Sequence, residues 1–121
     1  MRSILGNTRK ADITFHISGR ICLSARISKL LSLRQGDVID IMVAERETYI
    51  YAKHRNAVGR HEGMVYRSKK MSNHYIASSK KLCSYMLEKC KAENKVKLWC
   101  GTPENFELYG IALPIIVNSG T

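Results

Sequence analysis

Long apolar runs are missing from this chain of 121 residues. No segment approaches the ~18 consecutive apolar residues that a membrane-spanning helix requires. The opening segment, MRSILGNTRK, has only the apolar pair Ile4-Leu5, which is too short for the hydrophobic core of a signal peptide. We therefore expect a cytoplasmic protein that does not enter a membrane.

The chain also lacks the residue spacings that hold metals or perform catalysis. Cys83, Cys90 and Cys100 are separated by six and nine residues, which fits no zinc pattern, and the four histidines are scattered. There is no phosphate-binding glycine loop, nucleophile elbow or catalytic pair of carboxylates. The sequence therefore predicts no metal, no cofactor and no enzymatic activity. The cysteines, Cys22 included, are expected to be reduced and mostly packed.

Acidic residues are scarce in the middle of the chain. Overall, 20 Lys and Arg stand against 10 Asp and Glu, which gives a formal net charge of +10. Residues 53–70 hold six basic residues and the single acid Glu62. A surface of this charge favours polyanions, because each neutralised phosphate releases condensed counterions. The sequence predicts one basic face that binds nucleic acid or another acidic partner.

Two segments of the chain follow the same pattern. Residues 20–43 can be aligned with residues 74–100, which contain three additional residues. Each copy has a short strand, a serine that can cap a helix, an amphipathic helix, a turn and a further strand. The capping serines are Ser24 and Ser78, and the helices are expected over about 25–33 and 79–91.

The remaining elements follow from alternation and turn residues. Strands are expected at 12–17, 48–52 and 106–112, and left-handed residues after the helices at Gly36 and Asn94. Pro114 lacks a donor N–H, so it is expected on a sheet edge or at a strand start, followed by a tail that frays. Lys95, Lys97 and Trp99 are expected to share one strand face, opposite Val96, Leu98 and Cys100.

The first copy carries a recognisable order of motifs. Gly19-Arg20, an aliphatic strand, the basic helix ARISKL, the segment LSL, Gly36-Asp37 and the strand VIDIMV follow one another. This order resembles the swapped-hairpin DNA-binding domain of the AbrB, SpoVT and MraZ families, which also includes MazE-type antitoxins. Where family members start the helix with proline and often carry paired arginines, this chain has Ser24 and Ser28-Lys29.

The resemblance implies a fold in which two copies interlock into one barrel. The chain is then a single domain, 1–121, mostly β with two short helices: a pseudo-two-fold swapped-hairpin or double-psi-like barrel built from two β-α-β-β repeats. Each repeat alone would leave an apolar face bare. The first repeat covers about 12–53, a basic linker 54–63, the second repeat about 64–113 and a short tail 114–121.

The resemblance also implies DNA contacts. By carry-over from the family, Arg20 in the strand turn and Lys29 in the helix contact DNA. Arg26 is added from the residues themselves, because a helix start favours an anion. The remaining predicted contacts are cations of the linker and the second repeat: Arg55, Arg60, Lys69, Lys70, Lys80 and Lys81. A solvated protein surface is the alternative for each of these residues.

The predicted function is that of a DNA-binding protein, a transcriptional regulator of the AbrB-like type that contacts duplex DNA through a basic face. The alternative is a protein-interaction module, antitoxin-like or adaptor-like, that uses the same barrel. Trp99 could anchor a partner or stack on a base. RNA is a third candidate ligand, although the stacking motif of RNA-recognition domains is missing. A homodimer and an acidic protein partner are further candidates.

Overall fold

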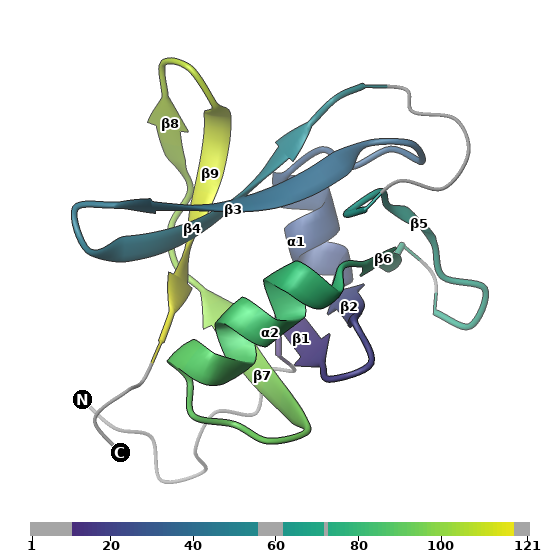
Figure 1. Cartoon of the computed structure of the whole chain (residues 1–121). Coiled ribbons are helices and arrows are strands. Elements are labelled where there is room, and N and C mark those ends of the chain that lie inside the picture. Colours follow the sequence, from purple (N-terminus) through teal and green to yellow (C-terminus); the bar gives the residue numbers. More distant parts are fainter. Residues whose placement is uncertain (1–10, 56–61, 72, 118–121) are drawn as a thin grey trace, which may run out of the picture.

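The computed structural model describes residues 11–55, 62–71 and 73–117. This part of the chain is mostly β with two helices, as the sequence predicts (Figure 1). In chain order the elements are β1 (Ile13–His16), β2 (Arg20–Leu23), α1 (Ala25–Leu30), β3 (Val38–Ala44), β4 (Glu47–Lys53), β5 (Tyr66–Arg67), β6 (Tyr75–Ser78), α2 (Lys80–Lys89), β7 (Lys95–Cys100), β8 (Glu104–Phe106) and β9 (Gly110–Ile116).

The strands form one antiparallel sheet that curls on itself. Its neighbours follow the order β3, β4, β9, β7, β1, β2, β6 and β5, and β8 pairs with β9. Although β3 and β5 stand at the two ends of this order, the segments leading into them meet. Gly36 N donates to Val65 O, Val65 N to Asp37 O and Ile39 N to Gly63 O, over 3.1, 2.8 and 2.9 Å. The curled sheet therefore encloses its inner side.

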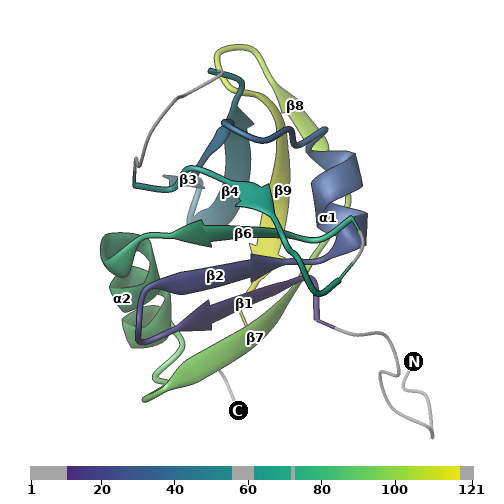
Figure 2. The same ribbon diagram turned by 90° about the vertical axis from the view of Figure 1, so that its right-hand side faces the viewer.

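The enclosed side of the sheet is apolar. Alternate residues of β1 and β2 point inward, so that Ile13, Phe15, Ile21 and Leu23 are fully buried. Burying a side chain of this size contributes about 1.5–3 kcal/mol each. Figure 2 shows β6, β2, β1 and β7 side by side, with α2 at one end of these strands and α1 at the other.

Both helices start at a serine cap. The Oγ atom of Ser24 accepts a hydrogen bond from Ile27 N, as predicted, over 3.3 Å. The second helix is capped by Ser79, whose Oγ accepts from Leu82 N over 3.0 Å. The prediction of Ser78 as this cap is wrong, because Ser78 still belongs to β6.

The helices are also shorter than predicted. Their left-handed end residues are Ser32, with φ +51°, and Lys91, with φ +55°, in place of Gly36 and Asn94. Gly36 does have a positive φ of +96°, but in the turn that leads into β3. Serine and lysine therefore adopt the left-handed conformation in which glycine or asparagine is usually found, so residue preferences alone do not predict these helix ends.

The C-terminal part of the sheet differs from the prediction. The expected strand 106–112 is instead the hairpin of β8 and β9. Pro114 is not on an edge, because β9 lies between β4 and β7. Pro114 pairs with Tyr49 on β4, and the next residue, Ile115, pairs with Cys100 on β7. The missing N–H of Pro114 is tolerated because β9 changes its pairing from β4 to β7 at this point. Residues 114–116, which the sequence analysis assigned to the tail, belong to β9.

The four cysteines are free thiols. Cys83 and Cys100 are buried, whereas Cys22 and Cys90 are partly buried, which confirms their predicted packing. Burial raises the pKa of both Cys83 and Cys90 above the ordinary value of 9.0. Within residues 11–55, 62–71 and 73–117, neither helix has the length and apolar character needed to cross a bilayer.

Candidate nucleic-acid interface

Four neighbouring strands, β7, β1, β2 and β6, present one surface that points away from the core (Figure 2). Lys97 lies opposite Thr14 in the register, Thr14 opposite Cys22, and Cys22 opposite Ile76. These residues point outward because the residues between them on β1, β2 and β7 fill the core. We call this surface the outer face, and it consists of Thr14, His16, Arg20, Cys22, Ile76, Ser78, Lys95, Lys97 and Trp99.

The outer face is positively charged. Arg20, Lys95 and Lys97 are exposed, and the four strands contain no Asp or Glu. The predicted orientation of Lys95 and Lys97 is confirmed, since Leu98 and Cys100 on the opposite side of β7 are buried. Exposed cations without neighbouring acids attract phosphate groups over several ångströms.

The charge of the outer face contributes to the pKa of His16. His16 lies beside Lys95 in the register and next to Arg20 across the β1–β2 turn. Its pKa is lowered from 6.5, chiefly by burial and further by the charges of Arg20 and Lys95. Its Nε2 atom lies 3.8 Å from the thiol of Cys22. Burial and the two cations together favour the neutral imidazole at this position.

At one end of the outer face, the β1–β2 turn meets the start of α2. Gly19 O accepts a hydrogen bond from Ser79 N over 2.8 Å. The backbone of Gly19 lies so close to Lys80 that an added Cβ would stand 2.9 Å from Lys80 Cγ. Arg20 follows this turn directly, so the structure brings together two predicted DNA contacts, Arg20 and Lys80. The third cation of this region, Lys81, instead lines a hollow with Asp40 and Glu62.

At the other end of the outer face lies α1, where Arg26 is held by an acid. Arg26 Nη1 donates to Asp12 Oδ2 over 3.0 Å, and the same oxygen accepts from Cys100 N over 2.8 Å. The side chain of Asp12 is 2% exposed and that of Arg26 is 38% exposed. A buried carboxylate needs such partners. The structure thus gives Arg26 a structural partner that the sequence did not suggest.

Lys29 on α1 faces a second group of cations. With Arg67 and Tyr75 it lines a hollow of about 380 Å³. The loop between β5 and β6 also carries the exposed residues Lys69 and Lys70, and Ser68 Oγ accepts from Lys70 N over 3.2 Å. Arg67 is a member of this group that the predicted contacts omitted, although it lies in the same basic run of the sequence.

The cations are therefore spread along the outer face and do not form a single helix surface. Figure 2 shows α1 and α2 at opposite ends of the four strands, so Lys29 and Lys80 are separated along the length of these strands. Of the linker residues, Arg55 lies beyond the end of β4, where it lines a different hollow with Arg34 and His54. Arg60 lies outside the described residues.

Within residues 11–55, 62–71 and 73–117, no three His, Cys, Asp or Glu residues come together as a candidate metal site. Comparison with protein-family models, with curated proteins and with solved structures returned no match. The fold and the charge of its surface are therefore the basis for assigning a function.

Proposed function

We propose that the protein binds duplex DNA through the outer face and acts as a transcriptional regulator of the AbrB-like type in the cytoplasm. The observation that carries this proposal is the exposure of Arg20, Lys95 and Lys97 on strands that hold no acid. Phosphate contacts of this kind supply most of the affinity of proteins for duplex DNA. Further cations extend the face at both ends: Lys80 at the start of α2, and Lys29, Arg67, Lys69 and Lys70 around α1.

The centre of the outer face favours a duplex over a single strand. Thr14, Cys22 and Ser78 are small, and the outward positions of β1, β2 and β6 hold no Phe, Tyr or Trp. The aromatic residue of the outer face, Trp99, lies on β7 opposite Ile116 of β9, away from this centre. Proteins that bind single strands use exposed aromatic rings on which the bases stack. Four strands spaced about 4.8 Å apart are about 14 Å across, which exceeds the ~12 Å major groove. The face would rest on the sugar–phosphate backbone.

We also propose that the barrel consists of two interlocked repeats, as the resemblance to swapped-hairpin domains implies. The pairing of β2 with β6 supports this, because the first residue of each strand lies opposite the last residue of the other. Ser24 and Ser79, the two helix caps, follow directly on these strands. In the same way, β4 pairs with β9, and the middle pair of this register is Ile50 and Leu113. A pseudo-two-fold axis that relates the two repeats requires each of these strands to pair with its counterpart in the other repeat.

A second candidate function, that of a protein-interaction module, is favoured by one observation. The hairpin of β8 and β9 exposes Leu108 to 88%, Tyr109 to 45% and Ile111 to 43%. Exposed apolar residues that lie together are typical of protein contacts. This hairpin extends away from the outer face in Figure 1. The two functions are therefore compatible with different surfaces of one chain.

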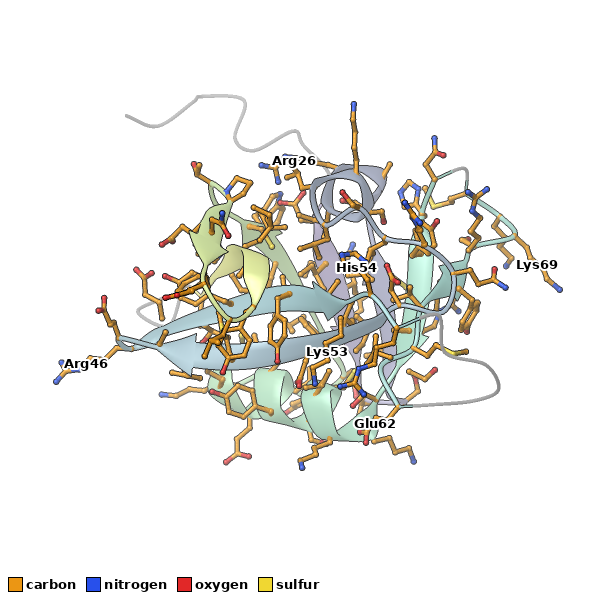
Figure 3. All side chains as sticks on the ribbon, turned by 90° about the horizontal axis from the view of Figure 1, so that it is seen from above. Arg26, Arg46, Lys53, His54, Glu62 and Lys69 are labelled. Carbon is orange, nitrogen blue, oxygen red and sulfur yellow. The ribbon has the colours of Figure 1, made fainter. Side chains whose placement is uncertain are left out.

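Fluorescence anisotropy with a labelled duplex of mixed sequence tests the DNA proposal. We expect R20Q/K97Q to weaken binding by about tenfold or more, since two phosphate contacts are lost. The matched control R46Q/K89Q removes the same charge from a hollow lined by Arg46, Thr48 and Lys89. Figure 3 shows Arg46 at the far side of the molecule from Lys69. Equal affinity for all three proteins contradicts the proposal, as does preference for the matching single strand.

A further inference from the structure

A polar hollow that is separate from the outer face opens next to the turn between α1 and β3. Its volume is about 400 Å³, and it is lined by Ser32, Arg34, Asp37, His54 and Arg55. None of these residues belongs to the outer face. In Figure 3, His54 lies near the centre of the view from above, between Arg26 and Lys53. A hollow of this size accommodates a small ligand.

The turn Arg34–Asp37 contributes two of the residues that line this hollow. Asp37 N donates to Arg34 O over 3.0 Å, and Asp37 Oδ2 accepts from Arg34 N over 2.9 Å. Gly36 occupies the third position of the turn with φ +96°, a conformation that glycine adopts without strain. The Gly36-Asp37 motif therefore fixes the carboxylate of Asp37 and, with it, the position of Arg34.

The carboxylate of Asp37 in turn orients His54. The Nδ1 atom of His54 lies 2.7 Å from Asp37 Oδ2. The side chain of Asp37 is 4% exposed and that of His54 is 56% exposed. Because an ionised carboxylate only accepts hydrogen bonds, Nδ1 carries the proton and Nε2 is the nitrogen that remains for a ligand. The hydrogen bond between Nδ1 and this buried carboxylate fixes the orientation of the His54 ring.

The second half of the chain is built without this pair. There the turn after α2 runs from Lys91, and Asn94 O accepts a hydrogen bond from Ile17 N over 2.8 Å. Helix caps and strand pairing recur in both halves, whereas Asp37 and His54 belong to the first half alone. The carboxylate–imidazole pair is therefore a feature of the first half among the described residues.

We propose that this hollow binds a phosphomonoester. Arg34 and Arg55 supply two guanidinium groups, which form forked hydrogen bonds with phosphate oxygens. In its imidazolium form His54 donates a third hydrogen bond from Nε2, and Asp37 is the one acid among the described residues that line the hollow. Two guanidinium groups match the two charges of a monoester better than the single charge of a phosphodiester. Arg55, which the sequence placed among the DNA contacts, is a ligand of this small anion.

Titration with inorganic phosphate, followed by NMR at the histidine Cε1–H resonances, tests this proposal. Sodium chloride at matched ionic strength is the reference. We expect a saturable shift of the His54 resonance that His16 and His74 do not share. R34Q/R55Q raises the half-saturation concentration by about tenfold or more, whereas the control R46Q/K89Q changes it by less than about twofold. The backbone hydrogen bonds of Arg34 remain in the variant, so the turn is retained.

Three outcomes overturn the assignment. An unshifted His54 resonance shows that the hollow does not bind phosphate, and equal weakening by R46Q/K89Q shows general attraction to a cationic surface. Dimethyl phosphate that binds as tightly as inorganic phosphate shows a site for diesters of nucleic acid instead of monoesters. Because the hollow shares no residue with the outer face, R34Q/R55Q leaves duplex affinity nearly unchanged, and the two proposals fail separately.

Discussion

Asp12 and Arg26 connect the start of β1 to α1 through a partly buried ion pair of 3.0 Å. The same oxygen of Asp12 accepts a hydrogen bond from Cys100 N, so one carboxylate joins β1, α1 and β7. Arg26, predicted as a DNA contact, therefore stabilises the fold.

The first prediction concerns this ion pair. Arg26→Gln leaves Asp12 buried with one partner fewer, and we expect the free energy of unfolding to fall by about 1–2 kcal/mol. Urea denaturation measures the change. Lys29→Gln, on the same helix but exposed, is the control and should alter stability by less than about 0.5 kcal/mol. If both variants lose the same amount, the ion pair with Asp12 has no special role.

A second prediction uses the titration of His16. Its pKa lies below 6.5 because of burial, Arg20 and Lys95. Arg20→Gln and Lys95→Gln should each raise this pKa, and bound duplex should raise it as well, since phosphates offset the same charges. An NMR pH titration of the free and the bound protein measures the shift. A pKa of His16 that does not respond to duplex contradicts the outer face as the binding surface.

The same shift makes stability depend on pH. The unfolded chain binds a proton at His16 more readily than the folded chain, because the folded pKa is lower. The contribution of His16 is therefore complete above pH 6.5 and is lost as the pH falls toward the folded pKa. His16→Gln should flatten the pH dependence of the free energy of unfolding in this window. A slope equal to that of the original chain contradicts the assignment.

The third prediction tests the closure of the curled sheet. Gly63 has φ +79°, and an added Cβ would stand 2.7 Å from Ile39 O. Gly110 has φ +72°, but an added Cβ would meet no atom within 4 Å. Gly110→Ala should therefore lower the free energy of unfolding by about 1 kcal/mol, because of backbone conformation alone. Gly63→Ala should lower it by about 3 kcal/mol or more, because it also displaces the segment that joins β3. Equal costs in thermal or urea unfolding contradict this closure.

Much of the local structure was predictable from the sequence. Alternation of apolar residues located β1 and β2, and the spacing of Lys95 and Lys97 gave the outward side of β7 correctly. The cap at Ser24 followed from the preference of serine for that position. These features depend on neighbours within a few residues, so a local pattern is sufficient to identify them.

The remaining features depend on contacts between distant parts of the chain. Nothing in the order of residues places Asp12 beside Arg26 and Cys100, or Asp37 beside His54. A periodic pattern shows which side of a strand faces the core, but not which strand lies next to it. For the same reason the sequence predicted one basic face, whereas the structure separates the two helices to opposite ends of four strands.

The most direct test of the proposed DNA interface is the salt dependence of duplex affinity. The logarithm of the association constant falls linearly with the logarithm of salt concentration, with a slope of about −0.9 for each phosphate contact. We predict that R20Q/K97Q makes this slope shallower by about 2, while R46Q/K89Q leaves it unchanged. An unchanged slope for R20Q/K97Q, or an equal reduction in the control, contradicts the outer face as the site of DNA binding.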